Sequence, residues 1–456
     1  MSIAEELVSN VVETGFASIP NECVDRAKWR IIDAVGCLIA GSNAPGCRET
    51  VDLVRKWGGA EESTILTHGF KAPAHNVAMA NSLMTRSYDF EPVEAEGETK
   101  SSPAHISGTT VPTAVTMAEY QKANGKDLIT ALVIGDDLVS RLGVASGFDF
   151  SLGWDNTGTM NGLGATAIAC KMLKLNAKQV SNAFGIALNQ LGGSMDGVWD
   201  KVMTFKLCMA LAARNGIVSA ELASRGFTGL KDPFLGKYGY FTLYCRNSHT
   251  VNLTKDLGKR FYADRVIKPY SACRATHSAI DSALKIACGN NIRVEDIKEI
   301  TVHVTSGLLS GFTGQPFVLG ETPQIDGAFS VRYTIATALL RKGVKPAYFT
   351  DNCLHDPKIQ ELIDKMRLVA NIPSDRSPAT KIEVKMKDGT MLSATTDFPK
   401  GDIFRTPLTK DEIRAKFWDN VTFSQTVPVE KAEKALKLLE NLESIPDVRE
   451  IVSLLA

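Results

Sequence analysis

A basic segment near position 270 has the residue types and spacing that could bind an anion. Two cationic side chains, Lys268 and Arg274, lie between a short apolar run and a stretch of helical periodicity that begins at Thr276. A strand-to-helix junction presents free backbone N–H groups, and these favour negatively charged ligands. The segment therefore predicts a local anion site. A solvated Lys-Pro surface loop is the alternative interpretation of the same residues.

Sequence patterns for other common chemistries are absent. No Gly-x-Gly-x-x-Gly follows a strand pattern, and there is no Walker loop, His-Glu-x-x-His or Gly-x-Ser-x-Gly. The nine cysteines are scattered without a Cys-x-x-Cys pair, which argues against a zinc or iron–sulfur site and against a disulfide framework. We therefore predict no cofactor and no metal, and expect acid–base chemistry on an anionic substrate.

Length and charge restrict the class of protein further. A chain of 456 residues exceeds what one hydrophobic core usually organises, so two domains are expected. Lys plus Arg and Asp plus Glu number 51 each, so no global field recruits nucleic acid or an anionic membrane. The first residues lack the pattern of a signal or transit peptide, and no apolar run approaches 18 residues. These features predict a cytoplasmic protein without a membrane segment.

Helical patterns dominate residues 1 to about 264. Apolar residues recur at three-to-four spacing, and a glycine follows several of the runs in the manner of a helix C-terminus. The clearest runs are 23–40, 110–124, 126–142 and 162–175. The many Ala and Gly residues near 162–167 suit helices that pack closely. We predict a large all-helical domain here.

The pattern changes after about residue 265. Strand-like alternation occurs at 297–304, 381–386 and 391–395, with helical stretches between them near 275–289, 329–342 and 357–368. After residue 399 helical patterns return, at 410–417 and 429–441. We predict a mainly α fold with an α+β second domain. The division is 1–264 helical, 265–398 α+β, and 399–456 rejoining the helical domain.

The basic segment resembles a family signature. Residues 268–277 are similar to the K-P-Y-x-x-C-R-x-T-H motif of the MmgE/PrpD family, typified by 2-methylcitrate dehydratase. The resemblance extends over nearly the whole chain. It implies the same two-domain layout, a homodimer, and an active site in the cleft between the domains.

Two further signatures occur in the family's order. Segment 86–93 is similar to H-x-x-D-F-D-D-T, with Asp89 at the first acid and Glu91 in place of the second. Segment 103–108 is similar to H-P-x-G and contains His105, just before a helical run. A helix N-terminus disfavours imidazolium, so His105 is predicted to be a neutral base. A surface or capping histidine is the alternative.

Two more matches follow along the chain. Segment 204–216 resembles T-K-x-x-H-A-G-x-A-A-x-N-G and places Lys206 on the family's carboxylate-binding lysine. Segment 328–333 resembles Q-F-S-x-x-Y and retains Tyr333, for which a helix-core position is the alternative. The resemblance implies that the lysines and Arg274 bind carboxylates. It also implies that His105 or Asp89 acts as the base, and that Tyr333 or a protonated carboxyl group acts as the acid.

One departure from the family pattern affects substrate choice. Residues 154–159 are similar to H-P-T-G-T, but Asp155 stands where the family has a histidine, beside Thr157, which is predicted to contact substrate. A carboxylate repels a polyanion by about 4 kcal/mol per close pair at an effective dielectric near 20. Asp155 therefore predicts a substrate with less negative charge or with an amino group. A helix N-cap is the alternative role for this side chain.

Three functions remain open at this point. The first is a cofactor-free lyase, dehydratase-like, that removes an α-proton from a hydroxylated di- or tricarboxylic acid and stabilises the enediolate. The second is an epimerase or isomerase of an amino- or imino-linked dicarboxylate, or a decarboxylase. The third is a non-catalytic relative that binds carboxylates. Departures at Val93, Asp155, Met209 and Ala328 favour the third. The retained lysines, His105 and Tyr333 argue against it.

Overall fold

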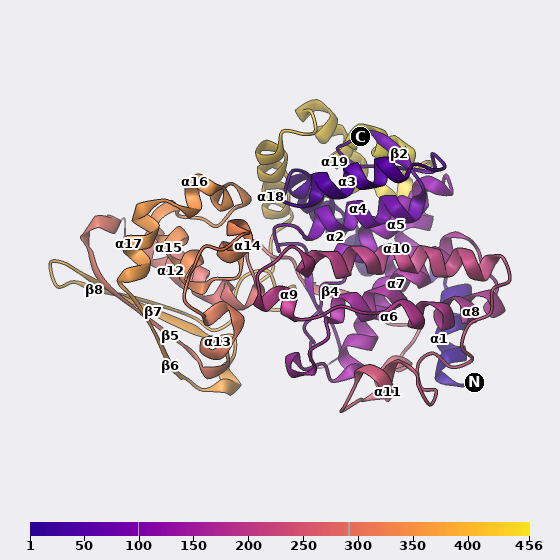
Figure 1. Ribbon diagram of the computed structural model, residues 1–456, viewed down its shortest axis with the longest axis horizontal. Helices are drawn as coiled ribbons and strands as arrows, with labels where there is room; N and C mark the ends of the chain where they lie inside the picture. Colours follow the sequence, from indigo (N-terminus) through magenta and orange to yellow (C-terminus); the bar gives the residue numbers. More distant parts are fainter. Residues whose placement is uncertain (99, 291) are drawn as a thin grey trace.

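The computed structural model describes residues 1–98, 100–290 and 292–456. Figure 1 shows two bodies side by side: a large helical domain, which holds both chain termini, and a smaller domain built on a β-sheet. The mainly α fold with an α+β second domain is therefore confirmed.

Helices from the first half of the chain form most of the large domain. They are α1 (Ile3–Glu13), α2 (Asn21–Gly41), α3 (Cys47–Trp57), α4 (Ala74–Arg86), α5 (Ser107–Tyr120), α6 (Gly125–Ser146), α7 (Asn156–Met172), α8 (Ala177–Ala187), α9 (Asp196–Trp199), α10 (Thr204–Ser224) and α11 (Tyr240–Tyr244). The apolar periodicity of the sequence predicted α2, α5, α6 and α7, with bounds that differ by up to six residues, because a buried helix face must be apolar. The long helix α10 was not among the runs that it identified.

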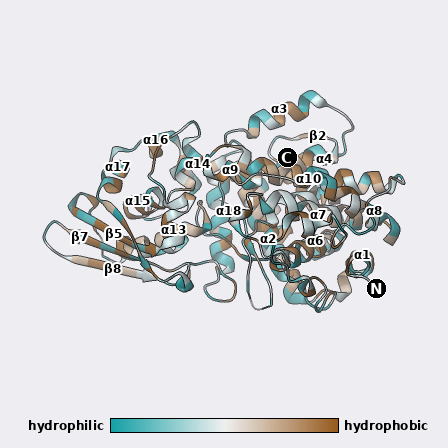
Figure 2. Ribbon diagram, turned by 60° about the horizontal axis from the view of Figure 1, so that its bottom comes forward, coloured by the Kyte–Doolittle hydropathy of each residue, from teal (hydrophilic) through white to brown (hydrophobic). Residues whose placement is uncertain are grey.

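Helices α6 and α7 pack on each other in the large domain (Figure 2). Nearly every residue of both helices is buried. A Cβ on Gly135 or Gly164 would lie 3.0 Å from the carbonyl oxygen of the other. The two glycines therefore permit the close approach that the small residues of this region predicted.

Two glycines that were expected to end helices have a different role. Helix α6 begins at Gly125 and runs past Gly143 to Ser146, and Gly147 in the left-handed conformation follows it. A Cβ on Gly125 would lie 1.7 Å from the Leu442 carbonyl oxygen, and one on Gly143 would lie 2.9 Å from the Ala95 Cβ. Both prevent long-range clashes, which a local pattern does not reveal.

Four short strands interrupt the helical part, contrary to the all-helical prediction. They are β1 (Ser63–Ile65), β2 (Phe70–Ala72), β3 (Val93–Ala95) and β4 (Asp264–Val266), paired antiparallel as β1 with β2 and β3 with β4. Strands of three residues have too few alternating positions to produce a recognisable period.

The smaller domain is a four-stranded sheet covered by helices. Its elements are α12 (His277–Gly289), β5 (Ile297–Thr305), α13 (Ser306–Ser310), α14 (Pro323–Ala328), α15 (Val331–Arg341), α16 (Asp351–Leu354), α17 (Pro357–Asp364), β6 (Met366–Ile372), β7 (Thr380–Met386) and β8 (Met391–Thr396). The strand order is β6-β5-β7-β8, with β5 and β6 parallel and the other pairs antiparallel. Helix α12 packs on β7 and β8, and α15 packs on α12.

Strand β6 was not predicted, because the helical pattern was extended from 357 to 368. Helix α17 ends at Asp364, and β6 begins at Met366. The strand lies at the sheet edge and no residue in it is fully buried. Its pairing with β5, more than 60 residues away in sequence, determines its conformation.

The C-terminal segment returns to the large domain (Figure 1). Its helices are α18 (Lys410–Ser424), α19 (Val429–Glu440) and α20 (Arg449–Leu455), and both α18 and α19 pack on α2. We propose 264/265 and 398/399 as the domain boundaries on this basis. Among the described residues, none of the helices is both long enough and apolar enough to cross a membrane.

Candidate active site

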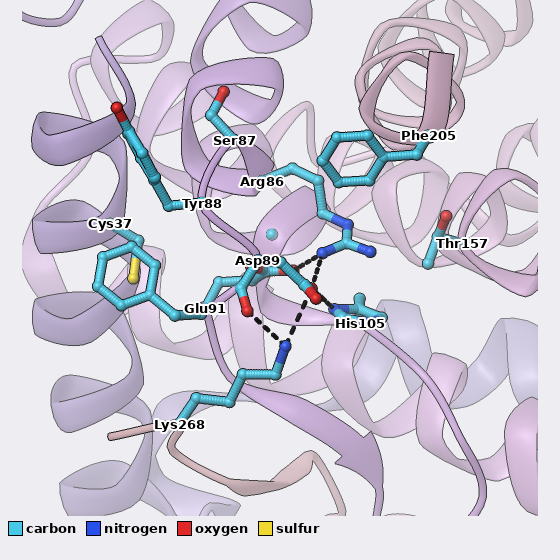
Figure 3. Close-up of polar contacts among 12 residues, drawn as sticks. Cys37, Arg86, Ser87, Tyr88, Asp89, Glu91, His105, Thr157, Phe205 and Lys268 are labelled. Carbon is cyan, nitrogen blue, oxygen red and sulfur yellow. Dashed lines mark hydrogen bonds and ion pairs between the residues drawn. The ribbon is translucent and has the colours of Figure 1, made fainter. Parts of the chain in front are cut away.

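Five charged or titratable side chains meet where α4 ends. They are Arg86, Asp89, Glu91, His105 and Lys268, shown in Figure 3. Asp89 adopts a left-handed backbone conformation, with φ of 51°. Aspartate tolerates this region better than most residues. The resulting turn belongs to the acid loop, defined here as Ser87–Glu91.

The pairing of β3 with β4 brings the parts of the cluster together. Val93 is in register with Val266, and Ala95 is in register with Asp264. Strand β3 follows the acid loop directly, and β4 ends two residues before Lys268. The Lys268 Nζ atom therefore reaches the acid loop, where it lies 2.9 Å from Asp89 Oδ1 and donates to the Asp89 carbonyl oxygen at 2.6 Å.

His105 and Glu91 form a hydrogen-bonded acid–base pair. The distance from His105 Nδ1 to Glu91 Oε1 is 2.6 Å. An ionised carboxylate only accepts hydrogen bonds, so the ring carries its hydrogen on Nδ1 and leaves the Nε2 lone pair free. Burial lowers the pKa of His105, and the charge of Arg86 lowers it further against the opposing effect of Glu91. The lowered pKa of His105 agrees in direction with the prediction of a neutral base. Burial, rather than a helix terminus, is the main cause of this lowering.

The two carboxylates are held ionised by the two cations. Burial raises the pKa of Asp89, but Arg86 and Lys268 outweigh it and hold the pKa below its usual range. The pKa of Glu91 is also lowered, because Arg86 and His105 outweigh the effect of its burial. Arg86 contacts both carboxylates through Nη1, at 3.3 Å from Glu91 Oε1, and stacks on the Phe205 ring at 4.9 Å. The two negative and two positive charges of the cluster therefore cancel.

Of these five side chains, His105 is the one that solvent reaches. Its side chain is 22% exposed, whereas the other four are 5% exposed or less. A substrate that approaches the cluster therefore meets the imidazole first. The cations lie behind it, where low dielectric strengthens their attraction for an anion.

The same residues were tested for a metal site. One ligand atom from each of Asp89, Glu91 and His105 lies within 4.8 Å of the others. However, Arg86 and Lys268 already neutralise both carboxylates at hydrogen-bond distance. A divalent cation would add two charges beside two cations, which is unfavourable at low dielectric. The cluster as a whole therefore has no excess negative charge with which to bind a divalent cation.

The Asp155 carboxylate caps α7, as the alternative interpretation predicted. Its Oδ1 atom accepts from the Thr157 backbone N–H at 2.8 Å and from the Thr157 hydroxyl at 2.7 Å. Its Oδ2 atom accepts from the Cys208 thiol at 3.4 Å. Thr157, predicted to contact substrate, therefore has its hydroxyl committed to Asp155.

Lys206 is buried on the other side of the acid loop. Its Nζ atom donates to the Pro45 carbonyl oxygen at 2.5 Å, to Ser87 Oγ at 3.0 Å and to Cys47 Sγ at 3.7 Å. Burial lowers its pKa. Figure 3 shows the Ser87 side chain pointing away from the Asp89 carboxylate, so the structure does not bring Lys206 into the charged cluster.

Arg274 lies in the basic segment, but its bonds are to the protein. It donates to the carbonyl oxygens of Lys400 at 2.7 Å and Pro399 at 3.2 Å, and its Nε is 3.4 Å from Glu94 Oε1. It also donates to Nδ1 of the buried His277 at 3.3 Å. These contacts tie the junction between the domains together, and they leave Lys268 as the cation of this segment that enters the cluster.

Tyr333 takes the helix-core position that was weighed as its alternative. The side chain is fully buried, its hydroxyl donates to the Tyr348 carbonyl oxygen, and its ring stacks on Phe317 at 5.2 Å. Burial raises the pKa of the phenol, which makes it a weaker acid. All these contacts are within the smaller domain, so the structure does not bring Tyr333 to the cluster.

Two residues of the site were not predicted from sequence. Arg86 lies three residues before Asp89 at the end of a helix, and this spacing is a signal that could have identified it. Asp264 accepts from the Ile106 and Ser107 N–H groups, at 3.3 and 2.7 Å, and so caps the helix that follows His105. No local pattern reveals that cap, because 157 residues separate the partners.

Comparisons with known proteins agree with this architecture. The MmgE/PrpD N-terminal domain matches residues 5–251, and the MmgE/PrpD C-terminal domain matches residues 270–444. Among curated proteins, the cis-aconitate decarboxylase-like protein oryM of Aspergillus oryzae is 26% identical over 482 residues, with 100% of this chain and 97% of that protein covered. The cis-aconitate decarboxylase of Aspergillus terreus is 24% identical, with 88% and 85% covered. Because the two domain families together span both domains of the structure, the chain belongs to the MmgE/PrpD family.

Proposed function

We propose that the protein is a cofactor-free lyase that removes a proton from the carbon beside a carboxylate in a hydroxylated di- or tricarboxylic acid. The observation that carries this proposal is the His105–Glu91 pair, 2.6 Å apart, with its imidazole at the exposed edge of a buried charged cluster. The free Nε2 lone pair is a base, and Glu91 stabilises the imidazolium that forms.

The cations behind His105 support the second half of the reaction. When the proton moves to Nε2, its bonding electrons form an enediolate on the substrate carboxylate. Lys268 and Arg86 would supply the positive charge that stabilises the enediolate, and fixed charges in a buried site contribute most to such steps. In dehydration the electron pair then expels hydroxide from the neighbouring carbon, and a protonated group completes it as water.

Decarboxylation is the second candidate, because the relatives are named cis-aconitate decarboxylase and cis-aconitate decarboxylase-like. There the carbon–carboxylate bond breaks, its electrons stay on carbon as carbon dioxide leaves, and a proton is delivered to that carbon. Protonated His105 would be the donor. The two candidates therefore require opposite protonation states of the same ring before the chemical step.

An NMR experiment in D₂O tests both candidates. The protein is incubated with 2-methylcitrate, cis-aconitate and a panel of other di- and tricarboxylates. Dehydration shows α-proton exchange and an alkene product, decarboxylation shows deuterium in a product with one carbon fewer, and epimerisation shows exchange with inversion. Binding without exchange or product for any acid would contradict the lyase proposal and favour a carboxylate-binding protein.

We also propose that the protein is a homodimer. Trp199 ends α9, Met203 precedes α10 and Leu207 lies in the first turn of α10, and these apolar side chains are 47%, 44% and 37% exposed. We call these three residues the apolar row. Exposed apolar residues that gather in one short segment are typical of a subunit interface.

A further inference from the structure

The acid loop is held by side chains that come from the second half of the chain. Four successive carbonyl oxygens, those of Ser87, Tyr88, Asp89 and Phe90, each accept a hydrogen bond from a side chain. The donors are Gln324 Nε2 at 3.1 Å, Ser271 Oγ at 3.1 Å, Lys268 Nζ at 2.6 Å and Lys416 Nζ at 2.7 Å, in that order. We call these four donors the carbonyl clamp.

The four donors of the carbonyl clamp come from three separate parts of the structure. Lys268 and Ser271 lie in the connection between β4 and α12, Gln324 lies in α14 of the smaller domain, and Lys416 lies in the C-terminal helix α18. All four are buried, with at most 8% of the residue exposed. Buried carbonyl oxygens need hydrogen-bond partners, and here side chains from three parts of the structure supply them to four successive residues.

The backbone at Asp89 needs such support. Its left-handed conformation is unfavourable for a residue with a side chain, and strained turns persist where the surroundings specify them. Glu91 lies two residues after Asp89, so this turn helps to set the direction of the Glu91 side chain, which is the partner of His105. A displacement of about 1 Å at a reacting group lowers a rate by up to about 100-fold.

We propose that Ser271, Gln324 and Lys416 are positioning residues, which fix the acid loop so that Glu91 orients His105. The His105–Glu91 geometry is then set by docking of the smaller domain and α18 onto the loop. The consequence for catalysis rests on the proposed lyase function, whereas the consequence for the His105–Glu91 hydrogen bond does not.

The test measures that hydrogen bond without a substrate. In protein labelled with ¹⁵N-histidine, a proton shared with a carboxylate at 2.6 Å resonates far downfield, and His105→Asn identifies the signal among the seven histidines. Ser271→Ala and Gln324→Met each remove one uncharged donor. We expect both to move this signal upfield or broaden it.

A matched control separates positioning from a general loss of stability. Ser282 is also buried and donates to a main-chain carbonyl, that of Thr380 at 3.2 Å, within the smaller domain. Ser282→Ala should leave the His105 signal unchanged. An unchanged signal in Ser271→Ala and Gln324→Met, or an equal change in all three variants, would overturn the proposal.

Lys416 needs a paired replacement, because its ammonium also neutralises the buried Asp33 carboxylate at 2.8 Å. Asp33→Asn with Lys416→Met removes the donor without leaving a buried charge, and Asp33→Asn alone is its control. We expect the His105 signal to change in the double variant only. A double variant with the wild-type signal would remove Lys416 from the clamp.

Kinetics provide the last comparison, with whichever acid the D₂O experiment identifies. We expect Ser271→Ala and Gln324→Met to lower kcat about tenfold or more with KM nearly unchanged, because orientation of the base is lost rather than substrate binding. If no acid reacts while the NMR differences are present, the lyase proposal fails and the positioning inference stands. Equal losses in Ser282→Ala would contradict the inference.

Discussion

At the scale of single residues, His105 is the group on which the proposed chemistry depends. Its neutral ring is exposed on one side and bonded to Glu91 on the other. Burial and Arg86 lower its pKa, so the ring becomes cationic only below the ordinary histidine value of about 6.5. The reaction type therefore determines which limb of the pH profile His105 controls.

We predict that kcat/KM for dehydration falls as the pH falls through a value below about 6.5, because the base is lost when Nε2 is protonated. His105→Asn should remove both this acidic limb and α-proton exchange. The check is kcat/KM measured from pH 5 to 9. A loss on the alkaline side instead would assign His105 the role of proton donor and favour decarboxylation.

Asp155 has two separable roles: its side chain caps helix α7, and its charge acts on the choice of substrate. Asp155→Ala should cost about 0.5–2 kcal/mol of unfolding free energy, since the first turn of α7 loses its acceptor, whereas Asp155→Asn keeps an acceptor oxygen. Urea unfolding measures this difference. Equal stability of the Ala variant and the wild type would contradict the capping role.

The same variants test substrate choice. If the Asp155 charge excludes a third carboxylate, Asp155→Asn and Asp155→His should raise kcat/KM for 2-methylcitrate and cis-aconitate about tenfold. Competition kinetics between a di- and a tricarboxylate give the measurement. Efficient turnover of 2-methylcitrate by the wild type, unchanged in both variants, would leave Asp155 as a helix cap only.

At the scale of elements, the start of α5 holds His105 in place. Asp264 in β4 accepts from two N–H groups and the Ser107 hydroxyl there, and Asn161 of α7 donates to the His105 carbonyl oxygen at 2.7 Å. Burial raises the pKa of Asp264 to about 7. A carboxyl group in this position links helix capping to pH.

We predict that the contribution of Asp264 to the unfolding free energy falls as the pH rises from about 4 to about 7. Its folded pKa exceeds the unfolded value of about 3.9, so the folded state holds the proton more tightly, and that advantage is lost as the carboxyl ionises. The loss is at most about 4 kcal/mol for a shift of about three pKa units. The Asp264→Asn variant should not show this loss of unfolding free energy.

Urea unfolding at pH 5 and pH 8 checks this prediction. The wild type should lose more unfolding free energy than Asp264→Asn between the two pH values, because other titrating groups are common to both proteins. A difference between the two proteins that does not change with pH would show that Asp264 keeps one protonation state throughout.

At the scale of the whole molecule, the proposed dimer face depends on the row formed by Trp199, Met203 and Leu207. Leu207→Glu should convert the dimer to a monomer, because a buried unpaired charge is costly at an apolar interface. Light scattering after size-exclusion chromatography gives the mass. Val429→Glu on α19, at a position 60% exposed, is the control and should leave the mass unchanged.

Much of this protein follows from sequence periodicity and order of motifs. The long helices α2, α6 and α7, the strands β5, β7 and β8, and the return of the C-terminal segment to the large domain were predictable. An element that buries one face must repeat its apolar residues at its own period. Asp89, His105 and Lys268 were also identifiable as candidates, because their residue types and order match a family signature, and Glu91 was identifiable because it replaces the second acid of that signature.

The arrangement of these residues required the tertiary structure. Arg86, Asp264 and the carbonyl clamp were not predicted, and Lys206 and Tyr333 were expected in a cluster that they do not enter. The short β3–β4 pairing, which joins residue 93 to residue 266, has no period of its own and forms only when the rest of the fold brings the strands together. Local patterns record which face of an element is buried. Packing between elements decides which distant side chain contacts that face, and this packing determines the geometry of the site.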